Sequence, residues 1–163
     1  MHIYGVVVDA SFPHKSFKTD KFICSLKITD ASMGVDERGI AETCSLVLFA
    51  KKFEDLPNCS KVGDIIRVHR ATVGFYKSKK QFTANIFFNS SWALFHSMSL
   101  AQFRKKYKKG EEVKQADVVG EKDYLPYQFF GKTFSFEKDE QKLIKGMRMW
   151  VENEFAKNLM LSS

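Results

Sequence analysis

The chain has 163 residues, of which 44% are hydrophobic and 28% charged, so it can bury the core of one domain and is too apolar for global disorder. Lys and Arg number 26 against 19 Asp and Glu, which gives a net charge of +7, and aromatic residues make up 14%, with 16 Phe among them. A single-stranded nucleic-acid binder needs both excesses, but a Phe-rich core under a basic surface has them too.

The first hundred residues have the pattern of β-strands. In residues 21–29, Cys24 and Leu26 alternate with Ser25 and Lys27, as expected when one face of a strand is buried. Residues 42–50 alternate in the same way, and residues 65–76 read as one long strand. The predicted strands cover residues 3–11, 21–29, 42–50, 65–76 and 81–88.

Two connections between these strands are informative. Residues 51–56 read as a short helix that Pro57 ends, and residues 77–80 read as a tight basic hairpin loop. A helix between the third and fourth of five strands is the arrangement of an OB-fold, a small barrel. An SH3-like barrel is the main alternative, but it has no place for that helix. The sequence therefore predicts an all-β fold, a five-stranded OB-fold barrel.

The rest of the chain reads as a connector and a helix. We expect an OB-fold domain over residues 1–97, a basic, loop-like connector over 98–136 and a helical segment over 137–163. Apolar residues at three- and four-residue spacing predict a helix over 137–160 that Ser135 can cap, packed on or beside the barrel or against a neighbour. Its predicted apolar stripe is Leu143, Met147, Trp150, Val151, Phe155 and Leu159.

No pattern in the chain indicates catalysis, a metal or a cofactor. The motifs of serine hydrolases, P-loop proteins and zinc proteases are absent, and the four His lack ligand spacing. Cys24, Cys44 and Cys59 are odd in number and far apart, which is typical of reduced thiols in an intracellular protein. We find no run of 18 apolar residues and no N-terminal leader pattern, so we expect neither a membrane span nor a signal peptide.

The predicted strands place basic loops beside the expected ligand face. In an OB-fold this face lies over strands 2 and 3, bordered by the loops between strands 1 and 2 and between strands 4 and 5. Here those loops are residues 13–19 and 77–80, and both are basic. Tyr76, next to the second loop, is the first candidate for stacking on a base. Phe49 on the third strand is a second candidate, or part of a small second core.

Most of the other aromatic rings are expected to be structural. Alternation puts Phe87 and Phe88 on opposite faces of the fifth strand, so one of them should be in the core, and the pattern does not say which. The rings assigned to core and packing include Phe22, Phe53, Phe95 and Phe155.

Five collinear segments resemble a known family. They are residues 7–15, 23–30, 46–57, 63–72 and 90–95. In them the chain resembles the first OB-fold of the alpha subunit of ciliate telomere end-binding proteins. Through Gly63-Asp64-Ile65-x-Arg67-x-His69-Arg70 it is more distantly similar to the animal protection-of-telomeres proteins. The resemblance covers residues 3–96 well and is weaker in the C-terminal helix, which in the family leads to a second OB-fold.

The resemblance implies that the protein binds the single-stranded, G-rich 3′ overhang of telomeres in the nucleus. Such binding would cap chromosome ends and control access by telomerase. It implies a beta-type subunit as a partner, bound through regions that are not in this chain. The family uses at least two OB-folds for DNA, and this chain has room for one. We therefore expect a fragment or a short paralogue that binds fewer nucleotides, and more weakly.

The resemblance also assigns aromatic DNA contacts. Tyr76 matches a stacking tyrosine at the end of the fourth strand, and Phe49 matches a stacking aromatic on the third. Phe88 matches an aromatic residue, often Tyr, that lies against the DNA, and Phe87 matches its aromatic neighbour. Phe88 keeps the aromatic ring but lacks the hydroxyl, which puts one polar contact in doubt.

Polar contacts follow in the same way. Lys27 and Asp30 match positions on the second strand that reach the DNA, and Gln81 matches a polar contact after the hairpin. Asp30 could accept hydrogen bonds from guanine N1 and N2, and Lys27 could donate to O6 and N7. The lysines expected to attract phosphates are Lys15, Lys18, Lys51, Lys77, Lys79 and Lys80.

A second hypothesis comes from a different class. The chain could be an OB-fold protein-interaction module of a telomere or replication complex, with the helix over 137–160 as the docking element and only non-specific affinity for nucleic acid. The basic run 104–109 is expected to be a plain solvated segment.

Overall fold

The fold is a β-barrel with one helix packed against its side. In this computed structural model the structure describes residues 1–30, 32–34, 37–38, 42–59, 61–97, 124–131 and 138–155. The strands are β1 (Ile3–Ala10), β2 (His14–Lys15), β3 (Phe22–Thr29), β4 (Cys44–Ala50), β5 (Ile65–His69), β6 (Thr72–Tyr76), β7 (Lys79–Asn85), β8 (Ser91–Phe95) and β9 (Gln128–Phe130).

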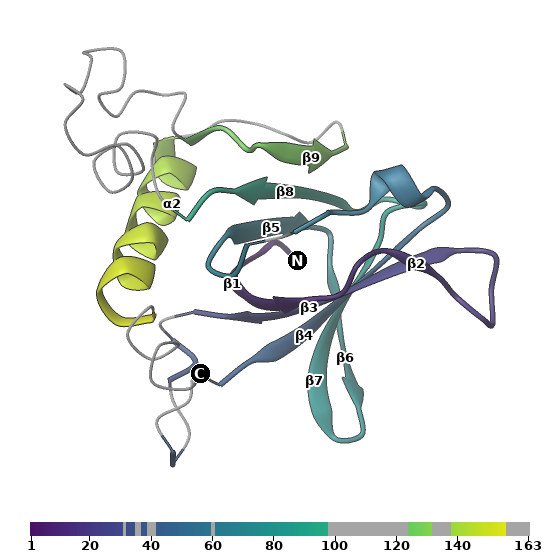
Figure 1. The fold of residues 1–163 in the computed structure, drawn as a ribbon, viewed down its shortest axis with the longest axis horizontal. Coiled ribbons are helices and arrows are strands. Elements are labelled where there is room, and N and C mark those ends of the chain that lie inside the picture. The colour runs from purple at the N-terminus through teal and green to yellow at the C-terminus, as the bar shows by residue number, and fades with distance from the viewer. Residues whose placement is uncertain are drawn as a thin grey trace.

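The strand order and the short β5–β6 connection together curl the sheet into a barrel. Along the sheet the strands follow the order β6-β7-β4-β3-β1-β5-β8-β9, and β2 pairs with β3. β4 and β7 are parallel, and β1 is antiparallel to both β3 and β5. Since β5 and β6 are separated only by Arg70 and Ala71, the sheet must curl to bring its two parts together, as Figure 1 shows. This confirms the predicted OB-fold, with β5 and β6 as two halves of its fourth strand.

The predicted long strand over 65–76 is interrupted. Arg70 has a φ of 60°, a left-handed conformation that takes the chain out of the ladder. The break is held by Ser90, whose Oγ donates to the Arg70 carbonyl at 2.8 Å, and by Arg70, which donates from its guanidinium to Asn89 Oδ1 at 2.8 Å. The break lets β5 pair with β1 and β8 while β6 pairs with β7.

The hairpin loop and the fifth strand also differ from expectation. The turn has two residues, Lys77 and Ser78, because β6 ends at Tyr76 and β7 begins at Lys79. Both turn residues have positive φ, which is typical of two-residue hairpin turns. β7 ends at Asn85, and residues 86–89 form a turn rather than the predicted end of the strand. The predicted alternation therefore fails beyond Asn85.

The barrel core follows the predicted alternation. Cys24, Leu26, Leu46 and Leu48 are fully buried between the sheet layers, and the residues between them on β3 and β4 are at least partly accessible. The predicted helix after β4 is a single 3-10 turn, Phe53–Asp55. It is fixed by the Trp92 indole, whose Nε1 donates to the Asp55 carbonyl at 2.8 Å.

Three of the Phe assignments can be checked against burial. Phe95 is fully buried, and Phe22 packs half-buried against the barrel core, as predicted. Phe53 is 50% exposed, so it is not in the core, but its ring packs T-shaped against that of Phe22, with the two ring centroids 6.2 Å apart. The side chain of Phe155 lies outside the described part of the structure.

A helix covers the outer face of β1, β5 and β8 (Figure 1). It is α2 (Lys138–Trp150), continued by one π-helical turn, Val151–Phe155. Ile144 is fully buried in an apolar cluster with Val6, Ile65 and Phe95, and Trp150 packs against that cluster, as expected. Leu143, predicted in the buried stripe, is 46% exposed instead. The predicted cap Ser135 and residues 156–160 lie outside the described residues.

A buried ion pair ties this helix to the barrel. The Arg67 guanidinium on β5 contacts the Glu140 carboxylate on α2, and both residues are buried. The Tyr4 hydroxyl donates to the same carboxylate at 2.9 Å, and burial, reinforced by this carboxylate, raises the Tyr4 pKa. Arg67 alternates along β5 with the core residues Ile66 and Val68, so its side chain points away from the barrel core, and the helix covers it there.

Part of the predicted loop-like connector over 98–136 is a strand. β9 pairs with the edge of β8, and Tyr127 next to it donates from its hydroxyl to Asp64 Oδ2 at 2.5 Å. The Tyr127 ring stacks on His96, with the two ring centroids 4.0 Å apart. Among the described residues, no helix is long and apolar enough to cross a membrane.

Candidate nucleic-acid interface

Away from the helix, four strands present rows of accessible side chains. Lys27 on β3 lies opposite Ser45 on β4, Ser45 lies opposite Gln81 on β7, and Gln81 lies opposite Gly74 on β6. Residues directly opposite one another on neighbouring strands point to the same face of a sheet. We call this surface the open face. Its residues are Ile23, Ser25, Lys27, Ser45, Val47, Phe49, Thr72, Gly74, Tyr76, Lys79, Gln81, Thr83 and Asn85.

The open face contains five of the residues predicted to contact DNA. Lys27 and Gln81 share one row, and Phe49 lies between Ile23 and Asn85 in another. Tyr76 pairs with Lys79 at the end of the hairpin. These five residues come from four strands, so the register of the barrel, rather than closeness in sequence, brings them onto one surface.

Tyr76 has the surroundings of a base-stacking residue. Its side chain is 63% exposed. The Lys77 ammonium lies 5.4 Å from the centroid of its ring, and Lys79 is its partner across the hairpin. An accessible ring next to two cations can stack on a base while the cations attract the adjoining phosphates.

Phe49 is half-buried on the open face and is absent from both apolar clusters formed by the described residues. The alternative that it forms part of a second small core is therefore not supported. Its backbone carbonyl accepts a hydrogen bond from the Ile86 amide at 2.8 Å, which fixes the strand at this point against the end of β7.

Phe87 and Phe88 lie in the turn after β7. Phe87 is half-buried, and the Lys21 ammonium is 3.8 Å from the centroid of its ring. Phe88 is 82% exposed. Neither ring is in the core, so the prediction that one of them would be is wrong. The reason is that the strand ends at Asn85, which leaves both rings in a surface turn.

Asp30 follows directly after β3. Its Oδ1 accepts a hydrogen bond from the Ser32 backbone amide at 2.8 Å and another from the Ser32 hydroxyl at 2.5 Å. One carboxylate oxygen thus stabilises the turn after β3. A ligand that hydrogen-bonds to Asp30 has to share this carboxylate with the turn.

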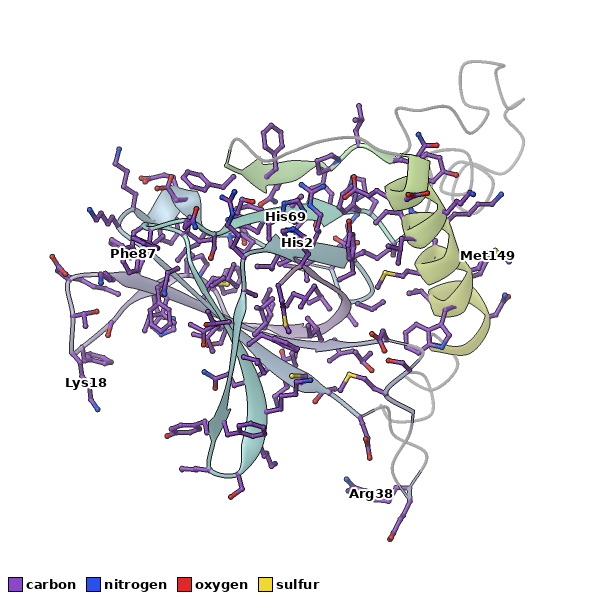
Figure 2. All side chains as sticks on the ribbon, turned by 180° about the vertical axis from the view of Figure 1, so that it is seen from behind. His2, Lys18, Arg38, His69, Phe87 and Met149 are labelled. Atoms are coloured by element: carbon purple, nitrogen blue, oxygen red, sulfur yellow. The ribbon has the colours of Figure 1, made fainter. Side chains whose placement is uncertain are left out.

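The β2–β3 hairpin forms the other border of the open face. β2 pairs with the start of β3, so Lys15 lies opposite Phe22 and points to the Phe22 side of the strand rather than to the open face. Lys18 lies near the tip of the hairpin (Figure 2). Phe12 and Phe17 in this region are strongly exposed, which the sequence analysis did not single out. Phe75 on β6 was also missed, although its alternation with Tyr76 could have indicated a ring on the opposite side of the hairpin.

The charge of this surface is suited to a polyanionic ligand. No Asp or Glu occurs between residues 65 and 110, so the β6–β7 hairpin is purely basic. Burial raises the pKa of the Cys24 thiol to about 12, which makes it a poor nucleophile. In the described part of the chain, no group of three or more His, Cys, Asp or Glu residues could hold a metal ion.

The barrel with its basic, aromatic open face defines an OB-fold of the kind that binds single-stranded nucleic acid. The family described as "Telomeric single stranded DNA binding POT1/CDC13" matches residues 1–160. The chain belongs to this family, as the resemblance in the sequence had indicated.

Individual proteins similar to this chain support its place in the family. The chain is 41% identical over 166 aligned residues to the telomere-binding protein subunit alpha of Stylonychia mytilus, covering 99% of this chain and 32% of the relative. It is 39% identical to the subunit of the same name from Sterkiella nova, with the same coverage. The chain therefore spans about a third of the length of these relatives. A solved structure titled as fission yeast Pot1 and ssDNA has the same fold, with a TM-score of 0.58 at 20% identity, over 93% of this chain and 42% of that one.

Proposed function

We propose that this chain binds single-stranded, G-rich telomeric DNA on its open face, and that in its parent protein it helps to cap chromosome ends and control access by telomerase. The observation that carries the proposal is the strand register, which puts Lys27, Phe49, Gln81, Tyr76 and Lys79 on one surface. Membership of a telomeric single-stranded-DNA-binding family supports it.

The aromatic residues supply affinity that depends little on sequence. Tyr76 and Phe49 stack on bases, each worth about 1–3 kcal/mol. Phe88, with its strongly exposed ring, extends the surface at the turn after β7, and Phe87 supports that turn through its contact with Lys21.

The polar residues supply the preference for guanine. Lys27 donates to guanine O6 and N7, and the second oxygen of Asp30 accepts from N1 and N2 while the first holds its turn. Gln81 lies in the same row as Lys27 and adds a contact to a base or sugar. Lys77 and Lys79, both exposed, attract phosphates at the hairpin beside the open face, and the exposed Lys15 attracts them from β2, on the side of that strand that it shares with Phe22.

The same proposal covers the organisation of the protein. Residues 1–97 form the DNA-binding domain, 98–136 connect it to the helix and add β9 to its sheet, and 137–163 lead to further domains of a longer protein. That protein acts at telomeres in the nucleus, as an alpha-type subunit with a beta-type partner bound elsewhere, and it has no catalytic activity. The names of the relatives as subunits, and the third of their length that this chain spans, support this organisation.

The test is a titration with three ligands: a G-rich telomeric single strand, its C-rich complement and the duplex of the two. We expect the G-rich strand to bind most tightly. Equal, weak binding to all three would mean that the chain attracts nucleic acid only through its positive charge, without sequence specificity. That result would favour an OB-fold that binds proteins. Oligonucleotides incubated with the protein and Mg²⁺ should stay intact, and their cleavage would contradict the non-catalytic role.

A further inference from the structure

The β6–β7 hairpin has a second face that the open face does not use. β4 pairs with β7 only from Gln81 to Asn85, so the residues nearer the tip form a two-stranded ribbon that projects from the barrel (Figure 1). Every residue from 72 to 80 is exposed. Tyr76 and Lys79 lie on one side of this ribbon, and the other side is accessible as well.

The back of the hairpin combines rings with a cation. Phe75 lies opposite Lys80, and Val73 lies opposite Phe82, so the four side chains share one face. Phe75 is 78% exposed. The Lys80 ammonium lies 5.2 Å from the centroid of the Phe82 ring, and Phe82 in turn packs against the barrel core. We call these four residues the hairpin back face.

Folding does not account for the position of Phe75. Its ring belongs to neither apolar cluster of the described residues, and an exposed ring on a projecting hairpin carries a risk of aggregation. A flat ring next to an ammonium group is what a single-stranded nucleotide requires, because the ring takes the base and the cation takes the phosphate. The hairpin itself carries Lys77, Lys79 and Lys80 and no Asp or Glu, which makes it attractive to a polyanion.

We propose that the hairpin back face is a second nucleotide-binding site for the same DNA strand, in which Phe75 stacks on a base and Lys80 contacts a phosphate. The inference rests on the proposed function of the open face. Phe75 and Tyr76 are consecutive, so their side chains point to opposite faces of β6. β6 stands at the end of the strand order, so a DNA strand that leaves Tyr76 can pass over the edge of β6 and reach Phe75. The DNA strand then contacts the β6–β7 hairpin on both of its faces.

The test compares two oligonucleotides by fluorescence anisotropy. A truncation series first defines a short telomeric strand, the shortest whose affinity still depends on Tyr76. The extended strand carries several further nucleotides at either end. We expect Phe75→Ala to lower the affinity for the extended strand about tenfold and to leave the short strand unchanged. Phe75→Trp should restore the affinity, and Lys80→Gln should reduce the salt dependence for the extended strand only.

Two comparison variants make the outcomes distinct. Tyr76→Ala should weaken both strands, and Phe129→Ala, which removes an exposed ring on β9, should weaken neither. If Phe75→Ala changes neither strand while Tyr76→Ala weakens both, the second site is wrong and the open face stands. If Phe75→Ala weakens both strands equally, Phe75 acts within the first site and the second site is again wrong. If the unmodified protein binds neither strand, the proposed function falls and the second site falls with it.

Discussion

The two sides of the barrel differ in how many of their faces are buried. On the side of β1, β5 and β8, one face meets the barrel core and α2 covers the other, so all five residues of β8 are buried. On the side of β3, β4, β7 and β6, one face meets the core and the other is the open face, so β4 alternates strictly between buried and accessible residues. The covered side is therefore buried on both faces, whereas the open side is buried on one face and accessible on the other.

The difference extends to the charged residues. The covered side buries Arg67 and Glu140 as an ion pair, whereas the charged residues Lys27 and Lys79 of the open face are exposed. A buried pair is costly to break because one charge then remains without compensation, while an exposed lysine can be removed with little effect on folding. Substitutions on the two sides should therefore affect different measurements.

The largest expected effect is on the covered side. Glu140→Ala leaves Arg67 buried without its carboxylate and should lower the free energy of unfolding by about 3–5 kcal/mol in urea titrations. Replacing both partners at once, with Arg67→Met and Glu140→Leu, should recover much of that loss. A loss below about 1 kcal/mol in Glu140→Ala would mean that the pair does not fix the helix to the barrel.

Two adjacent residues of α2 test which face of the helix is buried against the barrel. Ile144 is fully buried and Leu143 is 46% exposed. Ile144→Ala should therefore cost about 2–5 kcal/mol of unfolding free energy, and Leu143→Ala only about 0.5 kcal/mol. Equal losses, measured under the same denaturing conditions, would show that the buried face of α2 has been assigned incorrectly.

On the open side, Tyr76→Ala should weaken binding of G-rich DNA by about 1–3 kcal/mol and leave the melting temperature unchanged. The reason is that the ring is accessible and contributes stacking rather than core packing. Titration calorimetry and thermal melting on the same samples separate the two effects. Unchanged affinity would rule out Tyr76 as a stacking residue.

Lys79→Ala should have a smaller effect that is the same for every sequence. Loss of one phosphate contact should reduce the slope of log K against log salt by about 0.7. The order of preference among oligonucleotides should not change. If the variant alters that order instead, Lys79 reads bases, and the division between phosphate and base contacts on the open face would need revision.

The smallest effect concerns His69, whose ring centroid lies 4.2 Å from that of His2 (Figure 2). Burial, with help from Arg67, lowers the pKa of His69 from 6.5 to about 4. Between these values the unfolded chain binds a proton that the folded chain does not, so stability is present above pH 6.5 and falls as the pH drops toward 4. His69→Asn should lessen this fall in thermal melts. An identical pH profile in the variant would exclude His69 as the cause.

The sequence predicts the open side better than the covered side. The period-two alternation of β3 and β4 identified the core residues Cys24 and Leu46, and the same pattern identified Lys27 and Phe49 as outward residues. Such alternation arises wherever a strand has one wet face. The open face could therefore be assembled from the sequence once the fold was known.

The covered side could not be read in this way, because its outward residues are hidden by a distant part of the chain. Arg67 looks like a surface residue in its own strand, and only Glu140, 73 positions later, shows that it is buried. The break at Arg70 and the end of β7 at Asn85 were missed for a different reason: they depend on contacts with Ser90 and Asn89 rather than on local pattern. Because β7 ends at Asn85, Phe87 and Phe88 lie in the turn after it rather than on the strand.

The most direct test of the account is to map the DNA contact surface by NMR. A ¹⁵N-labelled sample is titrated with a G-rich telomeric single strand, and the amide shifts are followed residue by residue. We predict that the largest changes fall on β3, β4 and the β6–β7 hairpin, around Lys27, Phe49 and Tyr76, with little change along α2. Changes concentrated on α2 and β9, with the open face unaffected, would contradict the claim that the uncovered side of the barrel is the binding surface.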